Sequence, residues 1–415
     1  MEYLDNTLRP ERAVLVGVDT GEYDTDSSFR ELQQLAETSG ADVVAILCQK
    51  RAAPDSATYI GKGRLEELRV YCADEEIDLL IIDGDLTPSQ QRNIEREADV
   101  RVIDRTTLIL DIFALHARSG EGKLQVEIAQ LKYTLPRLGG KGTALSRLGG
   151  GIGTRGPGET KLETDRRHIR RRIQNLENDL DALKKRRSLL RERRKKDEVT
   201  TVAIVGYTNA GKSTLMNALT DAGVVAENKL FVTLDPTARQ LRLPGGREVL
   251  LVDTVGLIRR LPHHLVEAFL STLEEAANAD LILNVCDASD PECSEHLEVT
   301  RDLLDELDCG DTPVLTVLNK CDVAADPDTL AGLGKTVCIS ARTGQGLETL
   351  LVMIDAALPP TRMRVTLLLP YSMGSDAGKL RQDGEVHSET YTEHGLLLDL
   401  TASIRLLDRY KEYMQ

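Results

Sequence analysis

The sequence that most constrains the fold is Val202-Ala-Ile-Val-Gly206-Tyr-Thr-Asn-Ala-Gly211-Lys212-Ser213-Thr214-Leu215. A short apolar run ends in Gly-x-x-x-x-Gly-Lys-Ser and continues into helix-forming residues, which predicts the strand, phosphate loop and helix of a P-loop nucleotide-binding fold. Backbone N–H groups of such a loop turn inward on the α- and β-phosphates, and the positive end of the following helix assists them. Lys212 is expected to reach the β- and γ-phosphates, and the Ser213 hydroxyl is expected to be a Mg²⁺ ligand.

Two later motifs identify the base. Asn319-Lys320-Cys321-Asp322 follows an apolar run, and the Asp322 carboxylate can accept from both N1–H and the N2 amino group of guanine. Adenine offers no such pair of donors, so ATP should be rejected. Ser340-Ala341-Arg342 follows the next expected strand, where the Ala341 N–H is expected to donate to guanine O6. The predicted ligands are therefore GTP and GDP.

Asp253-Thr-Val-Gly256-Leu257 follows another apolar run, at 249–252. Asp253 is expected to hold Mg²⁺, and the Gly256 N–H is expected to contact the γ-phosphate. Leu257 stands where Ras-like enzymes have the glutamine that orients the attacking water, and a leucine forms no hydrogen bond. Slow intrinsic hydrolysis is expected. Water alignment would come from a partner, from a rearranged loop, or from K⁺ bound by Asn209.

The segment Phe231-Val-Thr233-Leu-Asp-Pro-Thr237 has the length of a first switch, and Thr233 is preferred over Thr237 as its Mg²⁺ ligand. The predicted catalytic residues are Lys212, Thr233 and Gly256, and the predicted Mg²⁺ ligands are Ser213, Thr233 and Asp253. The residues predicted to contact the nucleotide are Gly206, Tyr207, Thr208, Asn209, Ala210, Gly211, Lys212, Ser213, Thr214, Phe231, Val232, Thr233, Asp253, Thr254, Val255, Gly256, Asn319, Lys320, Asp322, Ser340, Ala341 and Arg342.

Four domains are expected in the 415 residues, making an α/β protein. Residues 1–116 alternate apolar runs with helix-like segments, which predicts a small, mostly parallel α/β domain. Residues 117–197 are expected to form an antiparallel helical hairpin, residues 198–358 a doubly wound P-loop domain, and residues 359–415 a small α+β domain. Tyr59-Ile-Gly61-Lys62-Gly63-Arg64 precedes a helix; a structural turn is favoured there over a second phosphate site.

The expected hairpin pairs two apolar stripes, one from Leu124 to Leu135 and one from Ile169 to Leu183, across a glycine-rich basic tip. Residues 155–197 hold sixteen Lys and Arg against eight Asp and Glu, although the whole chain carries a net charge of −15. We therefore favour contact with a nucleic-acid backbone over a solvated coiled-coil face. The tip has no aromatic residue, so base stacking is not expected there. The predicted RNA contacts are Arg147, Arg155, Arg166, Arg167, Arg170, Arg171 and Arg172.

The composition argues against several classes of protein. The seven cysteines form no C-x-x-C pair, so neither a disulfide framework nor a zinc site is expected. No signal peptide and no apolar run of membrane-spanning length is found. A cytoplasmic monomer is expected.

Four segments together resemble the HflX family, in the TrmE-Era-Obg-HflX group of P-loop GTPases: Gly-Tyr-Thr-Asn-Ala-Gly-Lys-Ser at 206–213, Phe-Val-Thr-Leu-Asp-Pro-Thr at 231–237, Asp-Thr-Val-Gly-Leu at 253–257, and Gly-Thr-Arg-Gly-Pro-Gly-Glu-Thr at 153–160. The resemblance implies a GTPase that binds the large ribosomal subunit, is stimulated by it, and splits or rescues stalled ribosomes. It also implies a hairpin tip near the peptidyl-transferase RNA and ATP binding by the N-terminal domain; it gives residues 361–415 no role. Two alternatives stay open: a cation-activated GTPase accessory to RNA remodelling or tRNA modification, and a nucleotide-binding scaffold that scarcely turns over.

Overall fold

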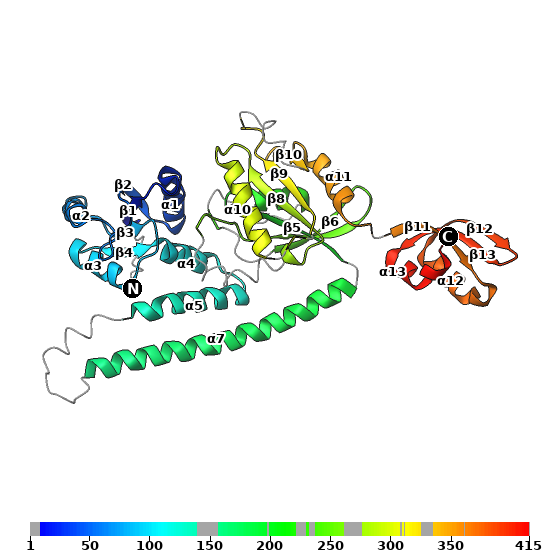
Figure 1. The fold of residues 1–415 in the computed structure, drawn as a ribbon, viewed down its shortest axis with the longest axis horizontal. Helices are drawn as coiled ribbons and strands as arrows, with labels where there is room; N and C mark the ends of the chain where they lie inside the picture. Colours follow the sequence, from blue (N-terminus) through cyan, green and yellow to red (C-terminus); the bar gives the residue numbers. More distant parts are fainter. Residues whose placement is uncertain are drawn as a thin grey trace, which may run out of the picture. The chain divides into compact units, whose positions relative to one another are not determined.

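The computed structural model describes residues 9–138, 157–196, 199–220, 230–231, 237–260, 276–307, 309–310, 312–324, 335–360 and 362–414. The chain forms two compact units, Met1–Met353 and Ile354–Gln415 (Figure 1). The finer division into four domains stays a prediction.

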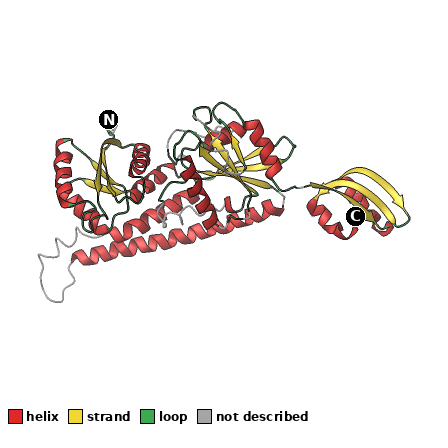
Figure 2. Ribbon diagram, turned by 45° about the horizontal axis from the view of Figure 1, so that its top comes forward, coloured by secondary structure: helices red, strands yellow, loops and turns green. Residues whose placement is uncertain are grey.

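The N-terminal sheet has four parallel strands in the order β2-β1-β3-β4, which confirms the expected parallel α/β arrangement. The apolar runs of β1, β3 and β4 are buried strands, because helices cover both faces of the sheet (Figure 2). The run at 43–47 was expected to be buried as well, but it lies in the edge strand β2, which is only partly covered, and Ile46 is 48% exposed. The strand order reverses between β1 and β3, where sheets of this kind bind ligands at the carboxyl ends of the strands. The elements are β1 Arg12–Asp19, α1 Thr25–Ser39, β2 Asp42–Lys50, α2 Lys62–Asp74, β3 Leu79–Ile82, α3 Pro88–Ala98, β4 Arg101–Asp104 and α4 Arg105–His116.

Two helices follow, α5 at Gly120–Thr134 and the long α7 at Pro157–Lys196, with a 3-10 turn, η1, at Leu135–Arg137. They lie side by side in both views (Figures 1 and 2). Ile173 and Leu176 of the predicted stripe are buried, and the pairs Lys132–Glu177 (2.8 Å) and Arg187–Glu121 (3.0 Å) join the helices. The apolar stripe of α7 therefore has α5 as its partner, as expected. The glycine-rich residues 139–156 lie outside the described residues.

The second sheet has the order β10-β9-β8-β5-β7-β6, parallel except for the edge strand β6, and this confirms the doubly wound P-loop fold. β5, β7 and β9 end at Gly206, Asp253 and Asn319, so the parallel register brings three of the sequence motifs to one edge. The elements are β5 Thr200–Gly206, α8 Lys212–Thr220, β6 Thr237–Arg242, β7 Glu248–Asp253, β8 Leu281–Asp287, α10 Cys293–Glu306, β9 Val314–Asn319, β10 Thr336–Cys338 and α11 Leu347–Ala357.

The second unit is a three-stranded antiparallel sheet in the order β11-β13-β12, packed on short helices around its own apolar core. This confirms the small α+β domain. Its elements are β11 Arg362–Leu369, η3 Tyr371–Met373, α12 Gly374–Asp383, β12 Glu385–Thr392, β13 Gly395–Ser403, α13 Ile404–Leu407 and η4 Asp408–Tyr413. Within the described ranges of the whole chain, every helix is too short or too polar to cross a membrane.

Candidate functional site

The phosphate loop is a tight turn that depends on glycine. Gly206 has a φ of +146°, and a Cβ there would lie 2.1 Å from the carbonyl oxygen of Val285. Gly211 has a φ of +90°, and its Cβ would lie 2.3 Å from Asn319 Nδ2. Asn209 also adopts a left-handed φ, +60°. The motif's glycines are therefore required by backbone conformation and by close packing against neighbouring strands.

Lys212 lies under this loop with 7% of its surface exposed. Its Nζ donates to the carbonyl oxygens of Gly206 at 3.0 Å and Tyr207 at 2.7 Å. Burial lowers the pKa of this ammonium to about 8, and Asp253 acts in the opposite direction. The loop thus holds a poorly hydrated cation, which a phosphate oxygen can stabilise more strongly than an exposed lysine.

The two predicted Mg²⁺ ligands that the structure describes are adjacent. Ser213 Oγ donates to Asp253 Oδ2 at 2.8 Å, and Asp253 is fully buried at the end of β7. A hydroxyl and a carboxylate are oxygen donors of the kind that Mg²⁺ prefers, so the donor set fits this ion. The third predicted ligand, Thr233, lies outside the described residues, as does Val232.

The hydroxyl of Thr208 is buried and makes no hydrogen bond within the described part of the chain. Thr208 lies against Gly256: a Cβ on Gly256 would be 2.7 Å from Thr208 Cγ2 and 3.1 Å from Lys212 Nζ. The predicted γ-phosphate contact, Gly256, is therefore beside the loop lysine. A phosphate oxygen or a water at this place would satisfy the Thr208 hydroxyl, whose burial without a partner is costly.

Asn319 ties the base-recognition loop to the phosphate loop. Its Nδ2 donates to Ala210 O at 2.9 Å, and its Oδ1 accepts the Ala341 N–H at 2.9 Å. The Ala341 N–H, predicted to reach guanine O6, would therefore have to exchange this partner. Lys320 pairs with Asp287 at 2.6 Å, and Asp322 is exposed. The arrangement brings the guanine motif beside the phosphate loop, while its contacts to the base stay a prediction.

Several predicted nucleotide residues have structural contacts of their own. Thr254 Oγ1 donates to Ile204 O at 2.7 Å, and Ser340 Oγ accepts the Thr343 N–H at 3.2 Å. Val255 is buried in the apolar core. Two further residues that were predicted to contact the nucleotide differ in exposure: Thr214 is half-buried and Arg342 is exposed.

The second switch, residues 253–260, is bound to the phosphate loop by its backbone. Leu257 N–H donates to Gly206 O at 3.1 Å, and Thr208 N–H donates to Leu257 O at 2.8 Å. The Leu257 side chain is 5% exposed and lies in one apolar cluster with Phe113 of α4 and Phe231. The two phenylalanine rings meet edge to face at 4.7 Å. Leu257 and Phe231 are thus packing residues against the N-terminal domain, a role that sequence reasoning did not assign.

One arginine of the second switch, Arg260, enters the crevice at the carboxyl ends of β1 and β3, where it meets Arg105 of α4. Arg260, in a left-handed φ of +49°, donates to both oxygens of buried Asp83 at 2.9 and 3.0 Å and also contacts Ser28. Arg105 pairs with Asp83 at 3.2 Å and with Glu31 of α1. This crevice is the ligand position of such sheets, and in this protein a residue of the P-loop domain occupies it.

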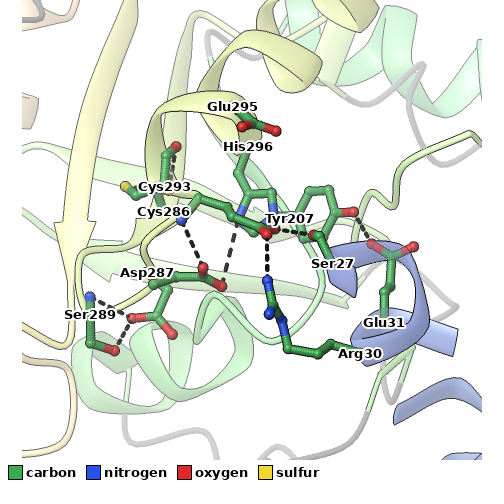
Figure 3. A network of polar contacts seen from close by, with 12 residues as sticks. Ser27, Arg30, Glu31, Tyr207, Cys286, Asp287, Ser289, Cys293, Glu295 and His296 are labelled. Carbon is green, nitrogen blue, oxygen red and sulfur yellow. Dashed lines mark hydrogen bonds and ion pairs between the residues drawn. The ribbon is translucent and has the colours of Figure 1, made fainter. Parts of the chain in front are cut away.

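A second polar cluster joins α1 to the start of α10 (Figure 3). Glu292 accepts from Ser27 at 2.6 Å and Arg30 at 2.8 Å, and it also pairs with Arg259 at 3.0 Å. The pKa of Glu292 is lowered: burial opposes the shift, but the Ser27 hydrogen bond and the cationic arginines outweigh it. Sequence reasoning missed these residues because they come from separate segments and have no shared spacing.

The Tyr59–Arg64 segment makes contacts that suit the favoured structural turn, which stays a prediction. Gly61 N–H donates to Gln49 Oε1 at 2.8 Å, and the Tyr59 hydroxyl donates to Asp83 O at 2.9 Å. Both polar groups therefore have protein partners.

The basic face of α7 is only partly exposed to a ligand. Arg167, Arg170 and Arg171 are exposed, whereas Arg166 donates to Leu138 O at 2.8 Å and Arg172 pairs with Glu127 at 2.8 Å. The predicted contacts Arg147 and Arg155 lie outside the described residues. Among the described residues, Arg167, Arg170, Arg171 and Arg172 are the exposed part of the predicted RNA surface, and the first three of these make no ion pair with the α5 helix in the way that Arg172 does.

Family models match three consecutive parts of the chain: a GTP-binding GTPase N-terminal domain at 26–114, a GTP-binding GTPase middle region at 116–194, and a 50S ribosome-binding GTPase at 201–320. A GTPase HflX of Caldanaerobacter subterraneus is 50% identical over 404 residues, covering 97% of this chain and 94% of that relative. The GTPase HflX of Escherichia coli is 40% identical over 390 residues, covering 93% and 92%. The crystal structure of a GTP-binding protein from Sulfolobus solfataricus in complex with GDP is 30% identical, covers 84% of this chain and 98% of that one, and has a TM-score of 0.46.

Proposed function

Because the chain belongs to the HflX family of GTPases, we propose that it is a Mg²⁺-dependent GTP switch that binds the large ribosomal subunit and takes part in ribosome splitting or rescue. The observation that carries the proposal is the meeting of the phosphate loop, the Ser213–Asp253 pair and the Asn319 loop at one sheet edge. The match of residues 201–320 to a 50S ribosome-binding GTPase supports the choice of partner.

In the proposed reaction each of these residues has a separate task. Lys212 would bind the β- and γ-phosphates, and the Gly256 N–H would sense the γ-phosphate. Mg²⁺, held by Ser213 and Asp253 with Thr233, would neutralise charge on the phosphate oxygens. Because Leu257 forms no side-chain hydrogen bond, turnover should be slow until the ribosome completes the site.

The partner is tested by sedimentation with purified large ribosomal subunits. We expect more of the chain to pellet with a non-hydrolysable GTP analogue than with GDP, because loss of the γ-phosphate releases the contact at Gly256. Equal pelleting in both states would count against a ribosome switch. GTP turnover measured with subunits present and absent then tests stimulation, and no turnover in any condition would favour a nucleotide-binding scaffold.

The base is tested with Asp322→Asn. Asp322 would accept two hydrogen bonds from guanine, and an amide cannot accept both, so preference should move from GTP toward xanthosine triphosphate. The change is measured as the ratio of the two dissociation constants. An unchanged ratio would contradict the assignment of Asp322 to the base.

The cation is tested by comparing turnover in KCl and NaCl. Asn209, in its left-handed conformation within the phosphate loop, is the proposed K⁺ ligand. Faster turnover in KCl that disappears in Asn209→Ala would support this and would favour the alternative function, a cation-activated GTPase accessory to RNA remodelling or tRNA modification, if subunit binding is also absent.

A further inference from the structure

Tyr207 is a phosphate-loop residue whose side chain joins three other elements. Its phenol oxygen accepts the backbone N–H of Arg259 at 2.6 Å, and its O–H donates to the carboxylate of Glu31 on α1. Its ring stacks on His296 of α10, with centroids 3.8 Å apart and planes 14° apart. Figure 3 shows the ring beside His296, with Glu31 approaching from α1. One side chain thus links the phosphate loop to the second switch, to α10 and to the N-terminal domain.

The backbone of Tyr207 also contacts the second switch. Its carbonyl accepts from Lys212 Nζ, and it forms a parallel β-bridge with Leu257. The second switch is consequently held to the phosphate loop at the Leu257 N–H, at the Leu257 carbonyl and at the Arg259 N–H. The third of these contacts depends on the tyrosine hydroxyl alone.

The surroundings of this hydroxyl keep it protonated. Tyr207 is 6% exposed, and its burial raises the pKa of the phenol to about 12. At neutral pH the phenol is therefore protonated, and it can donate to Glu31 while accepting from Arg259. Phenylalanine would fit the same space and stack on His296, but it would leave the Arg259 N–H and the Glu31 carboxylate without this partner.

The reaction gives a reason for such a contact. Leu257 cannot align water through its side chain, so alignment of the attacking group depends on where the backbone of residues 256–259 lies. A segment that is already fixed beside the phosphates loses little further entropy in the transition state, and small displacements of such groups reduce rates strongly.

We propose that Tyr207 is a positioning residue for GTP hydrolysis: its phenol fixes residues 256–259 against the phosphate loop, and Glu31 of the N-terminal domain fixes the phenol. The inference rests on the proposed GTPase activity. It assigns to the N-terminal domain a direct part in the geometry of the reaction site.

The test is Tyr207→Phe in the full chain, with GTP turnover measured in the presence of large ribosomal subunits. Loss of one hydrogen bond should lower kcat about tenfold while KM for GTP and the dissociation constant of GDP change less than about twofold. Amide hydrogen exchange of residues 257–260 should become faster. The matched control is Tyr391→Phe in the second unit, whose hydroxyl donates to Glu389 at 2.9 Å; it should leave all of these values unchanged.

A second variant tests the link to α1. Glu31→Gln keeps an oxygen that can accept from Tyr207 but removes the charge, so kcat should fall by less than in Tyr207→Phe. The double variant should be no slower than Tyr207→Phe alone, because Glu31 acts through the phenol. Losses that multiply would show that Glu31 affects turnover through another contact.

The outcomes separate this inference from the proposed function. Wild-type protein that does not hydrolyse GTP would refute the function itself. Wild-type turnover combined with an unchanged kcat in Tyr207→Phe, with a raised kcat, or with unchanged exchange at residues 257–260 would overturn only the role of Tyr207.

Discussion

Replacing Arg260 with methionine removes a guanidinium that the second switch inserts into the N-terminal sheet, and its cost can be worked out from the contacts. The variant keeps the apolar stem and deletes the hydrogen bonds to Asp83 at 2.9 and 3.0 Å. Asp83 is fully buried, but Ser28 at 2.6 Å and Arg105 at 3.2 Å still donate to it. The carboxylate therefore remains neutralised after the substitution.

Hydrogen bonds to charged groups contribute about 1.5–3 kcal/mol each when buried. The Arg260 side chain is 36% exposed, so water compensates part of the loss, and we expect about 1–2 kcal/mol less unfolding free energy. Arg105→Met should cost about 3–5 kcal/mol, because that side chain is 3% exposed and its removal leaves both Asp83 and Glu31 short of a buried cation.

The measurement is urea unfolding followed by far-UV circular dichroism, comparing midpoints at a constant m value. Arg96→Met is the control: its exposed pair with Glu97 should not shift the midpoint measurably. If Arg260→Met and Arg105→Met lowered the unfolding free energy equally, the partly exposed arginine and the buried arginine would contribute the same stability. The reasoning from burial would then be wrong. No loss at all for Arg260→Met would mean that the docking of the second switch contributes nothing to stability.

Three further predictions follow from the site. The pKa of Lys212, lowered by burial from 10.5 to about 8, means that the unfolded chain holds this proton more tightly. The unfolding free energy of the nucleotide-free protein should therefore rise between pH 8 and 10.5. GTP affinity, measured calorimetrically, should fall above pH 8. If neither quantity changed with pH in this range, and the wild type and Lys212→Met behaved alike, the prediction would be wrong. Thr208→Val removes a buried hydroxyl that lacks a partner among the described residues, so it should raise the unfolding free energy of the nucleotide-free protein by about 1 kcal/mol and weaken GTP binding, whereas unchanged GTP affinity would exclude a ligand role. Reversing the charges of three exposed arginines of α7, namely Arg167, Arg170 and Arg171, should weaken ribosomal RNA binding and flatten its salt dependence, with nucleotide affinity unchanged. RNA binding with an unaltered salt slope would show that the RNA contact lies elsewhere in the protein.

The parts of the fold that the sequence predicted are those in which local chemistry determines local conformation. Gly206 and Gly211 are needed because neighbouring backbone and side-chain atoms leave no space for a Cβ, so the motif itself specifies the loop. The apolar runs of β5, β8 and β9 became largely buried parallel strands, and the parallel register then placed Asp253 and Asn319 at the same sheet edge. For these elements the spacing along the chain carried the three-dimensional information.

The contacts between the N-terminal sheet and the second switch carried no such signal. Glu31 and Asp83 are acidic residues of ordinary appearance, and their partners Tyr207 and Arg260 are more than a hundred positions away. Nothing in the spacing distinguishes them from solvated surface charges, because charge pairing depends on how two domains pack. The polar cluster around Glu292 could not be predicted for the same reason.

Leu257 shows how the two kinds of information combine. The sequence identified it as the position where a water-orienting glutamine is absent, and the structure places its side chain in an apolar cluster with Phe113 and Phe231. Burying a leucine stabilises a fold by about 1.5–3 kcal/mol, whereas a glutamine at the same place would bury an amide in apolar surroundings. The same side chain therefore accounts for both observations. Leu257 packs the second switch against the N-terminal domain, and because it is apolar it cannot also orient water. This is why we propose that Tyr207, which holds the backbone of this segment beside the phosphate loop, contributes to positioning.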